Sequence, residues 1–552
     1  MAEASLWYKD AVFYELYVRA FCDSNGDGHG DLRGVSRRLD YLAELGVDCI
    51  WLLPTYPSPL VDDGYDISGH YGIHPDYGTL DDFKELVRAA HERGLRVITD
   101  LVLNHTSDQH PWFQASRRRQ EPYTDYYVWS DSDHRYREAR IIFIDTQPSN
   151  WTWDSLRGQY YWHRFYGEQP DLNYDNPAVQ DEMLRVMRFW LDLGLDGFRA
   201  DAVPYLYESE GTNCENLPET HAYLKRVRAV IAEEYPQAIL LAEANQWPED
   251  VRPYFGGNPR DPSVPGDEFH MSFHFPVMPR LFMALGREDR EPIVEILRRT
   301  PPLPFNSQWC TFLRNHDELT LEMVTEEERH WMWNYYAREP RMRLNLGIRR
   351  RLAPLVDGDR CRLELLYSLL FTLIGSPTIY YGDEIGMGDN IWLPDRNGVR
   401  TPMQWDAGHN AGFSDAPPDR LYSPLIADSD FGYERVNVAA QRADPYSLWH
   451  TIANMVRMRK THRALGWGAC EILPVTNSAV LAIVRTHGAE VVLAVHNLSS
   501  QPQPTLLDLR PWHGLRIEAL FAQREFPGSL GDKPCALTLQ PYEYFWLQMV
   551  PT

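Results

Sequence analysis

Four carboxylates stand at the ends of short apolar or β-branched runs along this chain. They are Asp100 in VITDLVLNH, Asp201 in GFRADAV, Glu243 in LLAEAN and Asp317 in FLRNHD. A parallel strand that is buried on both faces reads as a short apolar run, and barrel enzymes place their chemistry at its C-terminal end. Acids that reach one rim from different strands can serve as nucleophile, proton donor and electrostatic stabiliser, the set that a retaining glycosidase needs.

Asp201 and Glu243 have different local surroundings. Arg199 lies two residues before Asp201, so the period of a strand places both side chains on one face. A fixed guanidinium lowers the pKa of a neighbouring carboxyl and keeps it ionised, as a nucleophile requires. Glu243 follows an apolar stretch, which raises the pKa of a carboxyl toward that of a general acid. For a single acid, a helix cap or a lysine pair is the commoner explanation, and the ordered set is what favours catalysis.

The elements that must position these acids follow an alternating pattern from residue 11 to about residue 460. Strand-like runs alternate with helical patterns such as 80–94 and 181–194, which is typical of a parallel α/β fold. We predict an α/β (β/α)8 TIM barrel, with its eight strands at 11–21, 47–54, 95–104, 197–203, 238–245, 268–275, 309–317 and 376–386.

Two gaps between predicted strands are longer than a simple crossover needs. We therefore predict a catalytic barrel over 1–104 and 179–466, an inserted subdomain B at 105–178 after the third strand, and a helical lid insertion at 318–375. Alternating runs with Pro/Gly-rich turns predict a C-terminal antiparallel β-sandwich at 467–552.

Composition restricts the partners. The chain has 552 residues, of which 44% are hydrophobic, 24% charged and 13% aromatic, with a net charge of -24. Such charge argues against nucleic acid and anionic membranes as partners, and solubility is the commoner reason for it. Seven scattered cysteines without CxxC spacing predict a reducing compartment, with Cys49, Cys310 and Cys361 as core residues. With no leader-like start and no long apolar run, we expect a cytoplasmic protein, and leave open whether it is a homo-oligomer.

Short motifs give the chain a resemblance to the α-amylase family, glycoside hydrolase family 13. The four stretches conserved in that family are similar to DLVLNH (100–105), GFRADAV (197–203), AEAN (242–245) and RNHD (314–317), and a further one to QPDLNYDNP (169–177). The resemblance implies that Asp201 is the nucleophile, Glu243 the acid/base and Asp317 the transition-state stabiliser. It also implies hydrogen bonds from His105, Arg199 and His316 to the glucose unit that is transferred.

Two longer stretches, 62–79 and 396–406, resemble the branch of the family that contains α-glucosidases and disaccharide isomerases. In that branch, the positions of Asp62 and Arg396 close a blind pocket at the non-reducing end, and that of Tyr65 stacks on the sugar. Gln169 matches a position associated with α-1,4 or α-1,1 bonds. The resemblance thus implies a disaccharide substrate.

A structural metal is expected at two places. DSNGDGHGD (23–31) resembles an EF-hand loop but has Gly34 at the twelfth position instead of glutamate. A compact loop could still hold Ca²⁺ or Mg²⁺ through Asp23, Asn25, Asp27, the His29 carbonyl and Asp31, and a metal-free Asx/Gly turn is the alternative.

The second metal site comes from the family resemblance. Relatives bind a calcium ion that joins the inserted subdomain to the barrel, and Asn104 and Asp171 match its side-chain ligands. The carbonyls of Tyr205 and Leu206, and Glu208, would complete the site. YLYESEG could equally be an ordinary helix start.

The expected activity is an intramolecular transglucosidation that reversibly converts maltose and trehalose, with minor hydrolysis and no organic cofactor. An α-glucosidase with the same residues is the main alternative, and a sucrose isomerase and a non-catalytic transporter partner are weaker ones. We also expect Glu318 and Glu322 to share a helical face and pair with Arg396 or Arg400, which would close the pocket against water.

Overall fold

Eight parallel strands close into a barrel in the computed structural model, which describes residues 3–528 and 530–551. All neighbouring pairs in the barrel are parallel. Their order is β1 (Phe13–Leu16), β14 (Ser376–Tyr380), β10 (Gln308–Phe312), β9 (Met271–Phe273), β8 (Ile239–Ala242), β7 (Gly197–Asp201), β3 (Arg96–Val102) and β2 (Cys49–Leu52). The predicted TIM barrel is confirmed.

The strands are shorter than the predicted ranges. Range 11–21 holds β1 and also the short helix α1 (Val18–Phe21), and range 309–317 ends as a strand at Phe312. Glu243 and Asp317 lie in the loops that follow β8 and β10 at the rim, whereas Asp100 lies within β3. Asp317 is therefore a loop residue, whereas Asp201 is the last residue of its strand.

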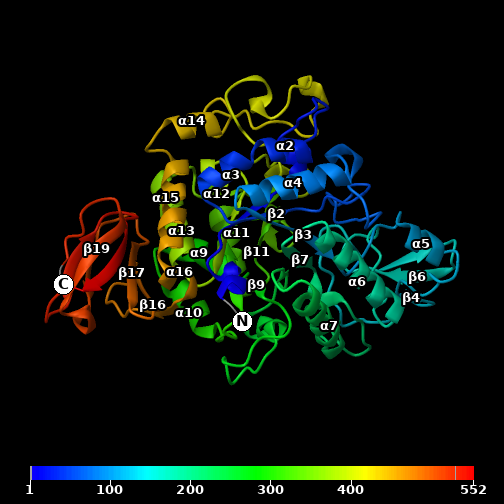
Figure 1. The fold of residues 1–552 in the computed structure, drawn as a ribbon, viewed down its shortest axis with the longest axis horizontal. Helices are drawn as coiled ribbons and strands as arrows, with labels where there is room; N and C mark the ends of the chain where they lie inside the picture. The colour runs from blue at the N-terminus through cyan, green and yellow to red at the C-terminus, as the bar shows by residue number, and fades with distance from the viewer. Residues whose placement is uncertain (1–2, 529, 552) are drawn as a thin grey trace.

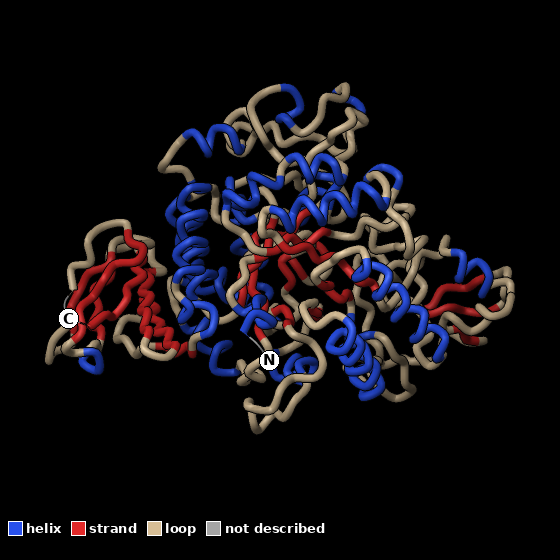
Figure 2. The backbone as a smooth tube through the Cα atoms, in the orientation of Figure 1, coloured by secondary structure: helices blue, strands red, loops and turns tan. Residues whose placement is uncertain are grey.

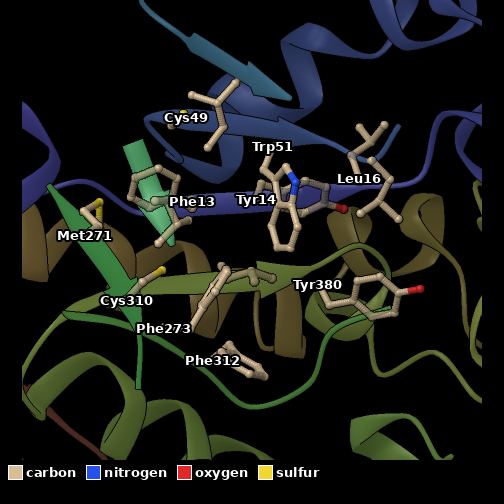
Figure 3. Close-up of a cluster of buried hydrophobic side chains, with 14 of the residues drawn as sticks. Phe13, Tyr14, Leu16, Cys49, Trp51, Met271, Phe273, Cys310, Phe312 and Tyr380 are labelled. Atoms are coloured by element: carbon tan, nitrogen blue, oxygen red, sulfur yellow. The ribbon is translucent and has the colours of Figure 1, made fainter. Parts of the chain in front are cut away.

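Aromatic side chains fill the barrel interior (Figure 3). The ring centroids of Trp51 and Phe273 are 5.6 Å apart, and those of Phe273 and Phe312 are 5.4 Å apart in an edge-to-face arrangement. Three strands, β2, β9 and β10, thus pack against one another through aromatic rings. Cys310 is buried beside them as predicted, and so is Cys49, but Cys361 is exposed, so its predicted core position is wrong. Cys361 stands in the first turn of α13 (Arg360–Thr372), and the buried residues of this helix begin only at Leu363.

Helices surround the barrel (Figures 1 and 2). The longer ones are α4 (Leu80–Glu92), α6 (Pro177–Asp192), α7 (Pro218–Glu234), α9 (Val277–Arg287), α10 (Glu291–Arg299), α13 and α15 (Leu448–Thr461). Shorter ones are α2 (Leu32–Arg37), α3 (Leu39–Leu45), α8 (Pro248–Val251), α14 (Val438–Ala443) and α16 (Arg463–Trp467). The start of α4 shows why they form where the pattern predicts, because Thr79 and Asp82 make a reciprocal capping box there.

The chain between β3 and β7 leaves the barrel. It forms α5 (Pro111–Ser116) and a three-stranded sheet in the order β4 (Trp129–Ser130), β6 (Gln159–Trp162), β5 (Trp151–Asp154), which projects to the right in Figure 1. Tyr136, Trp151 and Trp162 form a small core of its own. The domain boundaries stay predictions.

The expected helical lid at 318–375 also contains strands. After β11 (Leu319–Thr320) come α11 (Glu326–Tyr336), β12 (Arg343–Leu344), β13 (Gly347–Ile348) and α12 (Leu352–Leu355), and the short strands pair in the order β11-β13-β12. The helical description is therefore incomplete. Two-residue strands carry too little alternation to be recognised in a sequence.

The C-terminal region is an antiparallel sandwich, as predicted. One sheet has the order β15 (Ala469–Ile472), β16 (Val480–His487), β17 (Glu490–Asn497), β21 (Tyr544–Pro551), β19 (Leu515–Ala522), and the other pairs β18 (Gln503–Leu507) with β20 (Cys535–Leu539). Leu493, Leu507 and Phe545 are buried in one shared core. Within residues 3–528 and 530–551, no helix has the length and apolar character needed to cross a membrane.

Candidate active site

Two of the predicted catalytic acids share one guanidinium at the rim of β7 and β8. Arg199 is buried and donates from Nη1 to Asp201 at 2.6 Å, while its Nη2 lies 2.5 Å from Glu243. Both carboxylates therefore contact nitrogens of a single guanidinium. Retaining glycosidases keep this pair about 5 Å apart and inverting ones about 6.5–9.5 Å, so the arrangement fits the retaining mechanism.

The surroundings of the two acids separate their pKa values. Burial raises the pKa of Glu243 to about 8, as predicted, against the opposing charge of Arg199. Burial also raises the pKa of Asp201 to about 6, although Arg199 acts to lower it. The predicted net lowering is therefore wrong for Asp201, because loss of water outweighs the guanidinium. At neutral pH the order still suits a proton donor beside an ionised nucleophile.

Arg396 gathers the carboxylates at the inner end of the cavity. It donates to Asp317 at 2.8 Å and also to Asp62, and Arg400 donates to Asp317 at 3.0 Å. Burial raises the pKa of Asp317, but His316, Arg396 and Arg400 together lower it well below its usual range. We call Asp62, Asp317, Arg396 and Arg400 the floor of the cavity.

The aromatic wall joins the floor to the catalytic acids. The ring of Tyr65 stacks on His316 at 5.4 Å and 9°, and its Oη lies 2.9 Å from His316 Nε2. Asp100 accepts from Trp51 Nε1 at 2.8 Å, from Tyr65 Oη at 3.3 Å and from Arg199. Asp100 thus holds Arg199 in place from behind.

His105 and Gln169 stand on the far side of Asp62. Gln169 Nε2 donates to Asp62 at 2.9 Å and lies 3.3 Å from His105 Nε2. Burial lowers the pKa of His105 to about 3, so its ring is neutral. His105 lines the cavity, whereas Gln169 is fully buried behind Asp62.

The cavity has a volume of about 120 Å³, and sequence reasoning missed much of its wall. The missed residues that line it are Ile142, Phe143, Phe165, Ala202, Asn245, Phe275, Asn315 and Thr320. Most stand on the inserted segment or on loops after strands, outside any motif with its own chemistry. Ala202 in GFRADAV, Asn245 in AEAN and Asn315 in RNHD carried a usable signal, because each lies inside a family stretch.

An ion pair from the two insertions spans the outer end of the cavity. Arg140 Nη1 lies 2.6 Å from Glu322, its Nε lies 2.8 Å from Glu215, and its Nη2 donates to Tyr205 Oη at 3.1 Å. Glu322 and Tyr205 line the cavity. We call Arg140 and Glu322 the mouth pair.

The predicted ion pairs of Glu318 and Glu322 are wrong. Glu318 and Glu322 flank the strand β11 instead of sharing a helical face, and neither forms an ion pair with Arg396 or Arg400 in the described part of the chain. Glu318 instead accepts from Asn345 Nδ2 at 3.2 Å. The sequence pattern placed the right acids near the pocket but chose the wrong cations.

The loop at 23–31 satisfies its oxygens internally. Asp23 accepts from the N–H groups of Asn25 and Gly26 at 2.9 and 2.8 Å, and Asp31 caps α2 through Gly34 N–H at 2.7 Å. Asp27 accepts from His29 N–H at 2.9 Å. Of the residues described, no three or more His, Cys, Asp or Glu side chains form a group that could hold a metal. These oxygens fit an Asx-rich turn better than an ion site, and the predicted metal here stays a prediction.

The second predicted ion site is different. Asn104 Oδ1, Asp171 Oδ2 and Glu208 Oε1 are buried oxygens without a hydrogen-bond partner. Burial raises the pKa of Asp171 to about 8 and, with help from Asp171, that of Glu208 well above its usual range. Tyr205 and Leu206 lie just before Glu208 at the turn η3 (Val203–Tyr205). Converging, unpaired oxygens fit a hard cation.

Comparison with known proteins agrees with this geometry. A model of the α-amylase catalytic domain matches residues 15–341 and 349–468. The chain belongs to the α-amylase family. A second model, the C-terminal domain of maltogenic amylase, matches residues 470–546, which form the sandwich.

Individual relatives cover almost all of the chain. Trehalose synthase/amylase TreS of Mycobacterium tuberculosis is 59% identical over 98% of this chain and 90% of its own length. Trehalose synthase of Pimelobacter sp. is 56% identical over 100% of this chain and 97% of its own. Among solved structures, a mutant of trehalulose synthase MutB has a TM-score of 0.78 at 29% identity, covering 99% of this chain and 100% of its own.

Proposed function

We propose that this enzyme is a maltose α-D-glucosyltransferase, which interconverts maltose and trehalose within one closed pocket and releases a little glucose by hydrolysis. The observation that carries the proposal is a cavity with two carboxylates on Arg199 and an ion pair across each end. Relatives at 53% to 59% identity are named trehalose synthases, which supports trehalose as one of the two sugars.

The first step breaks the glycosidic bond of maltose. Glu243 gives its proton to the glycosidic oxygen while the carboxylate of Asp201 attacks C1 of the glucose unit at the floor. The bond between C1 and that oxygen breaks, and a β-glucosyl ester of Asp201 forms with a free glucose. Asp317, held ionised by Arg396 and Arg400, stabilises the positive charge that develops on the sugar ring.

The second step re-forms a bond at a different oxygen. The freed glucose turns over and attacks C1 with its anomeric hydroxyl, Glu243 takes the hydroxyl proton, and Asp201 leaves as a carboxylate. Two inversions retain the α configuration and give trehalose. Asp201 and Glu243 end in the protonation states in which they began, so the reaction needs no oxidant and no organic cofactor.

The floor residues are proposed to bind the glucose unit that is transferred. Asp62 and Arg396 form a charged end wall that leaves no room for a further sugar, Tyr65 offers a ring face, and His105 and His316 offer imidazole nitrogens. Gln169 acts through Asp62 and His105, since it touches both from behind.

The mouth pair is proposed to keep water out while glucose turns over. A plain α-glucosidase is the alternative, and it would use the same acids with an acceptor site open to water. A probable α-glucosidase of Rhizobium meliloti is 34% identical over 94% of this chain, so the family accommodates both outcomes.

One experiment separates the two functions. Maltose is incubated with the enzyme and an excess of ¹³C-labelled free glucose, and trehalose and glucose are resolved over time. The proposal predicts that trehalose is the main product and carries no label, because the glucose that attacks never leaves the pocket. Glucose as the main product would establish a hydrolase, and labelled trehalose would refute the intramolecular route.

A structural cation, Ca²⁺ by its oxygen ligands, is proposed at the second ion site. Asn104, Asp171 and Glu208 would hold it, with the carbonyls of Tyr205 and Leu206, and it would join the end of β3 to the inserted segment. It takes no part in the proton or glucosyl transfers. The cytoplasmic location remains a proposal from the cysteine pattern.

A further inference from the structure

A buried acid that belongs to no family motif named above stands behind His316. Glu15, on β1, is fully buried, and one carboxyl oxygen, Oε1, receives the backbone N–H of His316 at 3.1 Å and lies 2.5 Å from its Nδ1. Its second oxygen has no partner. Both hydrogen-bond contacts of this carboxyl group are therefore with His316.

The other nitrogen of that ring also faces a carboxylate. His316 Nε2 lies 3.2 Å from Asp317 Oδ2 and 2.9 Å from Tyr65 Oη. A neutral imidazole carries one N–H only, and the nitrogen that holds it is decided by the partner of the other nitrogen. With both neighbours ionised, a neutral ring would leave one nitrogen lone pair against a carboxylate.

We propose that Glu15 is a positioning residue of the reaction, which shares a proton with His316 Nδ1 and so keeps Nε2–H as a donor toward Asp317 and the bound sugar. Glu15 and the ring together hold two protons, one between Oε1 and Nδ1 and one on Nε2. The carboxyl group of Glu15 then faces the proton at Nδ1, and that of Asp317 faces the proton on Nε2. Tyr65 Oη can accept from Nε2–H while it donates to Asp100 at 3.3 Å.

The charges around the pair support this distribution. Burial raises the pKa of Glu15 well above its usual range, so this carboxyl takes up the shared proton readily. Asp317 stays ionised beside Arg396 and Arg400, and therefore needs a donor on Nε2. The remaining charged groups near the pair are Arg199 and Asp100, which pair with each other.

Glutamine cannot replace Glu15 in this role. The atom at Oε1 must accept the backbone N–H of His316 and also share a proton with Nδ1. An amide oxygen there can only accept, which forces the ring proton to Nδ1 and leaves the Nε2 lone pair facing Asp317. An amide nitrogen there would place two donors against each other at the backbone.

The test is a double-mutant cycle with Glu15→Gln and His316→Ala, and Glu384→Gln is the matched control. Glu384 is equally buried and accepts from Tyr14 Oη at 2.8 Å, but it does not line the cavity. We expect Glu15→Gln to lower kcat/KM for maltose by about 10- to 100-fold, by analogy with residues that orient a metal-bound histidine. The double variant should be no worse than His316→Ala alone. Glu384→Gln should stay within twofold of the wild type.

Losses that add in the double variant, or a Glu15→Gln enzyme within twofold of the wild type, would overturn the proposal. The assay rests on the proposed function, whose own failure would show as a wild-type enzyme that leaves maltose unchanged. Ring ¹⁵N shifts of labelled histidine are independent of activity, and His316→Ala identifies the signal. A ring proton that stays on Nε2 in Glu15→Gln would contradict the proposal even if activity fell.

Discussion

The floor and the mouth of the cavity are both closed by arginine–carboxylate pairs, but they are built differently. At the floor, Arg396 has only 7% of its side chain exposed and meets Asp62, Asp317 and Asp395. At the mouth, Arg140 is 35% exposed, and its contact with Glu322 is the one direct ion pair that spans the outer end among the described residues. The arginine at the floor is thus buried, whereas the arginine at the mouth is partly exposed.

This difference follows from the elements that carry each end. The floor residues follow barrel strands, whose register is fixed by hydrogen bonds on both sides. The mouth pair joins two insertions that meet only above the barrel, so its geometry depends on both. A rigid floor suits bond breaking, which needs fixed atoms, and a lighter mouth suits substrate entry and exit.

Removal of one of the two catalytic acids on Arg199, beside the floor, should have the largest effect. Asp201→Ala or Glu243→Gln should lower kcat by more than about 10⁴-fold, because each takes away a bond-forming or proton-transferring group. The melting temperature should change little, since acids at the C-terminal rim serve chemistry more than packing. Steady-state kinetics and thermal unfolding check this, and activity within tenfold of the wild type would remove the acid from its proposed role.

Loss of the floor arginine should come next. Arg396→Ala leaves Asp62, Asp317 and Asp395 without their shared cation, which costs about 3–5 kcal/mol when one partner of a buried pair is removed. We expect kcat/KM for maltose to fall by about 10²- to 10³-fold. Arg396→Lys should recover part of it, because a lysine keeps the charge but cannot bridge the carboxylates. Equal activity of the lysine and alanine variants would show that the charge is irrelevant.

The two catalytic acids beside the floor should set the pH profile. Asp201 must be ionised, so with a pKa of about 6 activity falls as the pH drops below that value. Glu243 must be protonated, so with a pKa of about 8 activity falls as the pH rises above it. The profile of kcat/KM should be a bell that loses about tenfold per unit beyond each limb, and the limbs belong to the coupled pair. A profile flat from pH 5 to 9 would contradict this assignment.

The catalytic acids were predictable from the sequence and the mouth pair was not. Asp201, Glu243 and Asp317 end apolar runs, and a barrel brings such ends together whatever its loops do. Arg140 carries no comparable signal, because it stands in a segment without periodicity and meets Glu322 across 182 positions of sequence. Loop geometry of this kind depends on packing, which is absent from local pattern.

Two other differences have the same origin. The pKa of Asp201 depends on how much water the folded pocket excludes. The sequence shows the neighbouring arginine, which lowers this pKa, but it does not show the burial that raises it. The metal-like loop 23–31 has oxygen-rich spacing, but the fold turns its oxygens to backbone N–H groups. Residue type predicted which groups come near one another, and the three-dimensional arrangement decided what each group binds.

Weakening the mouth should change the product ratio more than the rate. Arg140→Ala breaks the mouth pair, and a partly exposed pair worth about 1 kcal/mol would raise the ratio of glucose to trehalose about fivefold. Maltose consumption should persist, because the floor is intact. Arg117→Ala is the matched control, since Arg117 pairs with Asp154 at 2.7 Å in the same inserted segment. A ratio that rises equally in both variants would mean that general loosening, and not the mouth pair, admits water.

Chelation should have the smallest effect on activity, because the proposed ion acts on the mouth only through its support. The proposed cation joins Asn104, at the end of β3, to Asp171 on the insertion that also carries Arg140. An ion bound only to the folded chain at about a hundred times its Kd stabilises it by about 3 kcal/mol, so EDTA should lower the melting temperature. The chelator-induced shift should vanish in Asn104→Ala and persist in Asp23→Ala, because the Asp23 oxygens are already satisfied by N–H groups. If Asp23→Ala abolishes the shift and Asn104→Ala keeps it, the ion sits in the 23–31 loop, and the mouth gains no support from it.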